Sequence, residues 1–223
     1  MSITYTVVTY SIKQLTRILC NIDDRELINV PKHGPLIIAS NHVNFLDAPV
    51  VYTHLQPRKI TGFVKAETWE NPAMGFLFDL WDGIPLQRGE ADTTAFRLAL
   101  EALGQGKILA IAPEGTRSKD GKLRRGLPGM VYLAQRSGTP VIPVVYYGGE
   151  KFKNNVSQLK RTDFTIRVGK MFKLQPMDGK INKELRQTIV DEIMYQLALL
   201  LPPEYRGYYT DMAKVTTDYL DFV

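Results

Sequence analysis

The chain has 223 residues and a formal net charge of +5, and its 44% hydrophobic and 23% charged residues are typical of a packed globular protein. This composition excludes an intrinsically disordered chain, and a single cysteine excludes an internal disulfide framework and a cysteine-rich zinc site. The basic charge favours anionic partners, which include phosphates, nucleic acid and anionic membrane surfaces.

The N-terminal segment predicts an amphipathic helix, because apolar side chains recur there at helical spacing: Val7, Val8, Ile12, Leu15, Ile18 and Leu19. The helix either docks on the domain core or lies in a membrane interface. No run of about 18 apolar residues predicts a transmembrane span, and the start lacks the features of a signal peptide. We therefore expect an interfacial helix over 1–22 and one domain over 23–223, on the cytoplasmic face of a membrane as a peripheral or monotopic protein.

Strands and helices are predicted to alternate through the rest of the chain. Short apolar runs predict strands at 35–40, 59–67, 107–115, 140–148 and 164–172, and a strand or extended turn at 83–89. Periodicity and end signals predict helices at 47–55, 71–82, 91–106, 129–138 and 182–201. This alternation indicates an α/β fold with a mostly parallel central sheet flanked by helices. Ligands of such sheets usually bind beyond the carboxyl ends of the strands.

The segment "SNHVNFLD" follows the first of these strands and places His42 five residues before Asp47. On a continuous helix the two side chains would point about 140° apart, so they meet only if the backbone turns between them. A strand-to-helix junction provides such a turn, and Asp47 would then orient one ring nitrogen and leave the other as a base. The alternatives are a turn histidine bonded to backbone and an aspartate that caps the next helix, a role that Asp47 can combine with the first.

The segment "PEGTRS" follows another predicted strand and begins with Glu114. Gly115 lets the backbone turn sharply and approach a ligand closely. Arg117 offers a planar fork of donors suited to phosphate or carboxylate, and Thr116 and Ser118 carry hydroxyl donors. The alternative is a solvated turn with an exposed ion pair.

Further cations surround these segments. Arg88 in "GIPLQRG" is either a second cation at the same strand ends or an ordinary loop arginine. Lys119, Lys122, Arg124 and Arg125 follow "PEGTRS" directly. Such a run is usually a solvated face, but here it would also widen a phosphate site or touch anionic lipid headgroups.

Several known catalytic patterns are absent. The sequence has no G-x-S-x-G nucleophile elbow, no H-E-x-x-H, no zinc spacing of Cys and His, no P-loop and no G-x-G-x-x-G. Without an evident nucleophilic serine or cysteine, a histidine that activates the hydroxyl of the substrate itself is the more economical chemistry.

Four blocks in order resemble the glycerolipid acyltransferases, the family that includes the 1-acylglycerol-3-phosphate acyltransferases. They are "NHVNFLD" for N-H-x4-D, "GIPLQR" for G-x-x-x-x-R, "PEGTRS" for E-G-T-R, and "VIPVVYYG" for an apolar-Pro-apolar block. The resemblance covers roughly residues 25–175. One departure is Val43-Asn44, where many relatives carry a small polar pair, so these two residues are expected to influence acceptor preference.

The resemblance implies roles for individual residues. His42 would be the general base and Asp47 its orienting partner. Arg88, Glu114, Gly115, Thr116 and Arg117 would form the acceptor site, in which the arginines bind phosphate. Pro143 would shape the acyl region, and no metal or cofactor is implied.

The resemblance also implies a reaction, the transfer of a fatty acyl group from acyl-CoA or acyl carrier protein to lysophosphatidic acid at a membrane surface. The product would be phosphatidic acid. The alternatives are an acyltransferase for glycerol 3-phosphate or another lysolipid, a thioester hydrolase, and a non-catalytic lipid-binding module. Nucleic-acid binding is disfavoured, because no recognition motif is present.

Overall fold

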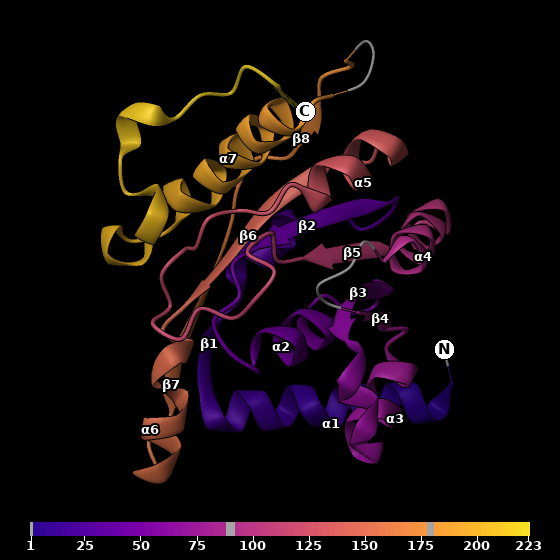
Figure 1. Ribbon diagram of the computed structural model, residues 1–223. Coiled ribbons are helices and arrows are strands. Elements are labelled where there is room, and N and C mark those ends of the chain that lie inside the picture. The colour runs from indigo at the N-terminus through magenta and orange to yellow at the C-terminus, as the bar shows by residue number, and fades with distance from the viewer. Residues whose placement is uncertain (1, 88–91, 178–180) are drawn as a thin grey trace.

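The computed structural model describes residues 2–87, 92–177 and 181–223 and shows three layers, with a central sheet between two layers of helices (Figure 1). Helices α4, α5 and α7 cover one face of the sheet, and α1, α2 and α3 cover the other. The predicted α/β class, with a mostly parallel sheet flanked by helices, is confirmed.

The sheet of the described residues has the strand order β1-β7-β6-β2-β5-β3-β4, with β8 and β9 added beside β6. Its strands are β1 Cys20–Asp23, β2 Leu36–Ser40, β3 Ile60–Lys65, β4 Ile84–Leu86, β5 Ile108–Ile111, β6 Val141–Tyr147, β7 Thr162–Val168, β8 Phe172–Leu174 and β9 Leu220–Phe222. Strand β2 runs parallel to both of its neighbours, β5 and β6. The antiparallel pairs all involve β6–β9.

The α-helices are α1 Ile3–Leu19, α2 Asp47–His54, α3 Pro72–Leu80, α4 Thr93–Gly104, α5 Gly129–Ser137, α6 Phe152–Ser157 and α7 Lys183–Leu200. Short 3-10 turns include η1 Arg25–Asn29, η3 Gly149–Lys151, η4 Pro203–Tyr205 and η5 Gly207–Tyr209. Several of the α-helices begin after a residue whose side chain accepts hydrogen bonds from the first free amides, such as Asn71 before α3 and Asn182 before α7. None of the helices in the described ranges is long and apolar enough to cross a membrane.

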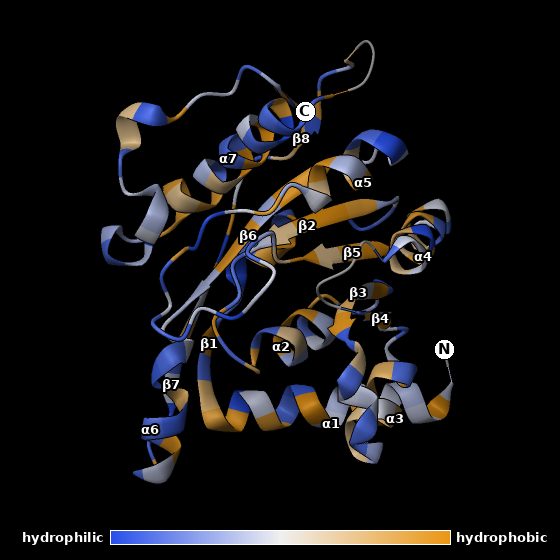
Figure 2. Cartoon of the chain, in the orientation of Figure 1, coloured by the Kyte–Doolittle hydropathy of each residue, from blue (hydrophilic) through white to orange (hydrophobic). Residues whose placement is uncertain are grey.

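Two apolar cores hold the layers together, one on each face of the sheet. Alternate residues of β2 serve the two cores: Ile37 and Ala39 face α7, whereas Leu36 and Ile38 face α2. Because both faces are covered, β2 is a continuous apolar run, as expected of a central parallel strand. Figure 2 shows these hydrophobic strands in the middle of the molecule.

The predicted strand over 164–172 is divided in the structure. It forms β7 and β8, which pair with different parts of β6 and are separated by Gly169, Lys170 and Met171. The sequence reading also missed β1, α6 and β9, which are only three to six residues long. Such short elements depend on tertiary pairing and carry little periodicity of their own.

Helix α1 forms as predicted and docks on α2, but only one edge of its apolar stripe faces the protein. Its inner face includes buried Thr9 and Thr16, and the Trp81 Nε1–H donates to Thr9 Oγ1 at 3.2 Å. Ile12 and Leu19 are half-buried on the same side. Five apolar side chains of α1 point outward and are more than half exposed: Ile3, Val7, Tyr10, Leu15 and Ile18.

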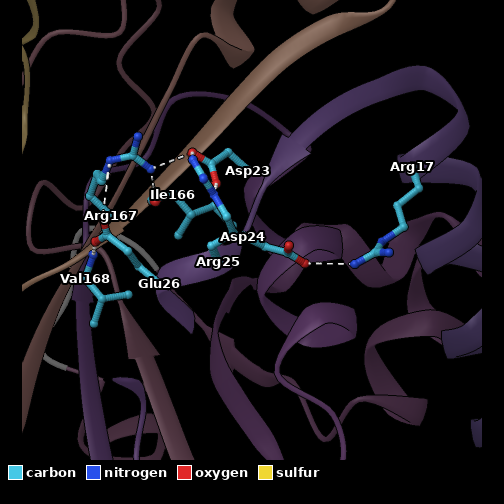
Figure 3. Close-up of polar contacts among 8 residues, drawn as sticks. All are labelled: Arg17, Asp23, Asp24, Arg25, Glu26, Ile166, Arg167 and Val168. Atoms are coloured by element: carbon cyan, nitrogen blue, oxygen red, sulfur yellow. Dashed lines mark hydrogen bonds and ion pairs between the residues drawn. The ribbon is translucent and has the colours of Figure 1, made fainter. Parts of the chain in front are cut away.

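A network of ion pairs fixes the segment after β1 onto β7 (Figure 3). Arg167 contacts Asp23 at 3.0 Å and Glu26 at 3.4 Å, and the Val168 amide donates to Glu26 at 2.8 Å. Arg25 also binds Asp23, at 2.8 Å, and together the two arginines hold the pKa of the Asp23 carboxyl well below its usual value. Of these two arginines, Arg167 is the one that lies on β7 and contacts both Asp23 of β1 and Glu26 of η1.

We expect Arg167→Met to lower the free energy of unfolding by about 1 kcal/mol, because it removes a partly buried cation that links two elements. Arg25→Met is the matched control, since its side chain is 85% exposed and binds a carboxylate two residues away. We expect it to cost clearly less than Arg167→Met, because solvent screens an exposed ion pair. Urea denaturation measures both, and equal losses would contradict the network's role in joining β1 to β7.

Candidate active site

The site lies at the carboxyl ends of three adjacent parallel strands. Strand β2 leads into His42, its neighbour β5 leads into Glu114, and its other neighbour β6 leads into Gly149. The loops after β2 and β5 are joined by a backbone hydrogen bond, in which the Ser118 amide donates to His42 O at 2.7 Å. The sheet therefore brings the first and third sequence blocks together, as the position of ligand sites in α/β folds predicts.

His42 and Asp47 meet across a turn, as the sequence predicts for an orienting pair. His42 Nδ1 lies 2.8 Å from Asp47 Oδ2, and the same oxygen accepts the amides of Val43 at 2.7 Å and Asn44 at 3.0 Å. The carboxylate is an acceptor, so Nδ1 carries the proton in this contact and Nε2 keeps its lone pair. The Asp47 side chain is buried and the His42 side chain is 24% exposed, so solutes can reach the imidazole.

Asp47 is the first residue of α2 and does not cap it. The helix has no side-chain cap, and the hydrogen bonds that Asp47 makes run back to residues before the helix. The predicted capping role is therefore wrong. The carboxylate instead fixes the turn that brings His42 back toward α2, so the orienting contact and the turn use the same oxygen.

Glu114 ties the two loops together. Its Oε1 accepts the His42 amide at 2.9 Å, and its Oε2 accepts the Arg124 amide at 2.9 Å. The residue is 4% exposed. Burial raises the pKa of this carboxyl to about 7, although the two amides oppose the shift. Glu114 therefore positions the backbone of His42 from inside the protein.

Arg117 faces the free nitrogen of the histidine. Its Nε lies 3.4 Å from His42 Nε2, at the long end of hydrogen bonding, and its side chain is exposed. Gly115 has a φ of +67°, and a Cβ there would lie 2.6 Å from Leu127 Cδ1, so the turn requires glycine. Thr116 is exposed, whereas the Ser118 hydroxyl is occupied by Asp120 at 2.9 Å.

Arg88, one of the predicted site residues, lies outside the described residues. Pro143, another, is not among the residues around His42. Pro143 is in the middle of β6 beside Ala39, and it lines a hollow of about 750 Å³ with Leu199 and Leu200 of α7. The described residues that line this hollow do not include His42. The acyl role of Pro143 stays a prediction.

Two asparagines in the first block were not recognised as structural. The Asn41 amide donates to Tyr146 O at 2.7 Å and accepts the Tyr146 amide at 2.8 Å, so a side chain continues the pairing between β2 and β6. The Asn44 amide donates to Gly149 O, and its oxygen accepts the Leu46 amide at 2.8 Å. A polar residue next to the histidine was visible in the sequence, but its distant backbone partners were not.

The family model named Acyltransferase matches residues 21–147, more than half of the chain. The chain therefore belongs to the glycerolipid acyltransferase family that its motifs resemble. The crystal structure of the 1-acyl-sn-glycerophosphate acyltransferase PlsC from Thermotoga maritima has a similar fold, with a TM-score of 0.62 and 21% identity, over 85% of this chain and 77% of that one.

Curated relatives carry related names. The chain is 31% identical over 133 residues to the chloroplastic 1-acyl-sn-glycerol-3-phosphate acyltransferase BAT2 of Brassica napus, a match that covers 58% of this chain and 38% of the relative. It is 28% identical over 121 residues to the 1-acyl-sn-glycerol-3-phosphate acyltransferase of Bacillus subtilis, covering 54% and 59%. The match thus spans less than two thirds of either relative.

We expect Glu114→Gln to change how stability depends on pH. The pKa of Glu114 is raised on folding from its usual value near 4.5 to about 7, so its stabilising contribution is complete below pH 4.5 and is lost as pH rises through 7. The wild type should lose up to about 3 kcal/mol relative to the variant between pH 4.5 and 8.

Urea denaturation of both proteins at several pH values measures this difference. The variant is expected to be less stable at low pH, because a glutamine nitrogen cannot accept the second backbone amide. A constant difference in unfolding free energy across the range would contradict the raised pKa.

Proposed function

We propose that the protein transfers a fatty acyl group from an acyl thioester to the free hydroxyl of lysophosphatidic acid and so makes phosphatidic acid. The observation that carries this proposal is the 3.4 Å approach of Arg117 Nε to His42 Nε2, with Asp47 behind the ring. A proton acceptor and a cation then face the same space. That arrangement suits an acceptor whose reacting hydroxyl lies close to an anion.

The chemistry follows from these positions. His42 Nε2 takes the hydroxyl proton as the acceptor oxygen attacks the thioester carbonyl, and Asp47 stabilises the imidazolium that forms. When the tetrahedral intermediate collapses, the carbon–sulfur bond breaks and the imidazolium returns its proton to the thiolate. The proposed reaction forms no covalent acyl-enzyme, so it requires neither a nucleophilic side chain nor a cofactor.

The short distance between base and cation favours a particular acceptor. In lysophosphatidic acid the hydroxyl and the phosphate ester are on adjacent carbons of glycerol, so both groups fit a site in which His42 and Arg117 are neighbours. Arginine binds phosphate through two parallel donors and so orients the acceptor. The names of the relatives support the same acceptor class. The thioester donor is acyl-CoA or acyl carrier protein.

We expect His42→Ala to lower the turnover number for acyl transfer by about 10²- to 10⁴-fold, because it removes the base. The matched control is His33→Ala, an exposed histidine, which should keep full activity. The measurement is thiol release from acyl-CoA with lysophosphatidic acid, glycerol 3-phosphate, a neutral lysolipid, or no acceptor.

The acceptor panel tests the rest of the proposal. Transfer only to acceptors that lack a phosphate would contradict the role of Arg117. Full thiol release without acceptor would identify a hydrolase, and retained transfer by His42→Ala would refute the base. Faster transfer to glycerol 3-phosphate or a neutral lysolipid would replace the proposed acceptor.

We further propose that α1 holds the protein peripherally on the cytoplasmic face of a membrane. Its inner face makes polar contacts: Thr9 with Trp81, and Tyr5 with Gln56 at 2.8 Å. Its apolar residues Val7 and Ile18 point outward, and they share a side because eleven residues make about three helical turns. A docked helix that exposes apolar side chains suits insertion into the boundary between headgroups and acyl chains.

Val7→Glu combined with Ile18→Glu is expected to weaken binding to anionic phospholipid vesicles by at least about tenfold, because two charges replace apolar side chains at the interface. The control is Ile28→Glu combined with Leu159→Glu, which changes two other exposed apolar residues. Sedimentation with vesicles measures both pairs. Equal binding of all three proteins would refute membrane contact by α1.

A further inference from the structure

The chain's C-terminal tail holds the loop that follows the E-G-T-R block. The tail is defined here as residues 203–209, which form η4 and η5, and the loop as residues 119–127. The Leu123 amide donates to Tyr205 O at 2.9 Å, and the Tyr208 amide donates to Leu123 O at 2.9 Å. Two backbone bonds to one loop residue fix the loop against the tail as in a short bridge between strands.

The tail also ties the loop to helix α7. The Tyr209 hydroxyl accepts the Gly126 amide at 2.9 Å and donates to Asp191 Oδ1 at 2.6 Å. Gln187 Nε2 donates to Gly126 O at 3.2 Å, so both backbone groups of Gly126 are held. Tyr209 is 1% exposed, so these contacts are shielded from water.

The opposite side of the loop reaches the catalytic histidine. The Arg124 amide donates to Glu114, whose other oxygen accepts the His42 amide. The tail also contacts the far wall of the site, because the Tyr205 hydroxyl donates to Glu150 Oε1 at 2.7 Å. The tail is therefore connected to the site through the loop on one side and through η3 on the other.

The clamped loop carries cations that are free to bind a ligand. Lys122, Arg124 and Arg125 are exposed and have no ion pair in the part of the chain that the structure describes. A cation on a fixed loop binds phosphate better than one on a loop that must first be ordered. The tail lies beyond the residues 21–147 that the family model matches.

We propose that the tail is a positioning element for the acceptor, in which Tyr205, Gly207 and Tyr209 fix the basic loop around the phosphate. The inference rests on the proposed function, because it assigns that phosphate to the acceptor of the same site. These residues act through the loop and touch no reacting atom. Loosening the tail should therefore weaken acceptor binding more than turnover or donor binding.

The sharpest test uses two glycines with similar backbones. Gly207 has a φ of +50°, and a Cβ there would lie 2.2 Å from Leu123 O, so Gly207→Ala must push the tail off the loop. Gly138 has a φ of +61°, but a Cβ there would meet nothing within 4 Å. Gly138→Ala thus adds the same kind of backbone strain without moving the loop.

Gly207→Ala is expected to raise the KM for lysophosphatidic acid roughly tenfold, while kcat and the KM for acyl-CoA change less than about twofold. Gly138→Ala should leave all three constants within about twofold. The affinity of the two variants for inorganic phosphate, measured by calorimetry, makes the same comparison without turnover. We expect roughly tenfold weaker phosphate binding for Gly207→Ala only. The phosphate titration therefore tests the tail even if the proposed acyl transfer is absent.

A second pair of variants removes only a hydroxyl. Tyr209→Phe breaks the bond to the Gly126 amide and should raise the acceptor KM roughly three- to tenfold. Its control is Tyr195→Phe, because the ring centroid of Tyr195 lies 5.0 Å from that of Tyr209. Lower melting temperatures with unchanged acceptor KM and phosphate affinity in Gly207→Ala and Tyr209→Phe would show a merely structural tail and overturn the proposal.

Discussion

The site depends on one buried carboxyl, that of Glu114, which accepts backbone amides from two separate segments. Neither His42 N nor Arg124 N has a strand partner for its amide, and both lie where the sheet has ended. A carboxyl reaches both because its two oxygens point in different directions. The raised pKa of Glu114 reflects the unfavourable burial of its charge, and the two amides that it accepts fix the backbone at His42.

Val43 and Asn44, the two residues that follow His42, also belong to the interior of the loop after β2. Val43 is 5% exposed, and both polar ends of the Asn44 side chain are used by backbone groups. These residues were expected to influence acceptor preference, yet their side chains are directed into the protein. Asn44 holds the loop after β2 against Gly149 in the loop after β6. Under the proposed function, acceptor preference then depends on residues that face outward, chiefly Arg117 and the basic loop.

The parts predicted from sequence are those that depend on local pattern. Strands β2, β5 and β6 were visible as apolar runs, and the placement of His42 near Glu114 followed from the parallel order of their strands. The division of β7 from β8 was hidden, because apolar side chains resume at Met171 and Phe172 soon after Val168. The contacts of Tyr205 and Tyr209 were hidden for another reason: the Tyr205 carbonyl and the Tyr209 hydroxyl bind backbone amides about 80 residues away, which leave no local signal.

The neighbours of β2 have a consequence for how the molecule folds. The bond from His42 to Glu114 spans 72 residues and the bonds from Asn41 to Tyr146 span 105. Closing such long loops is entropically unfavourable until the intervening elements have formed, so contacts of this kind arise late and slow the folding of a chain. The surroundings of His42 are therefore expected to assemble late, because they are incomplete until β6 has been synthesised. Recovery of activity after refolding would therefore time the completion of the sheet.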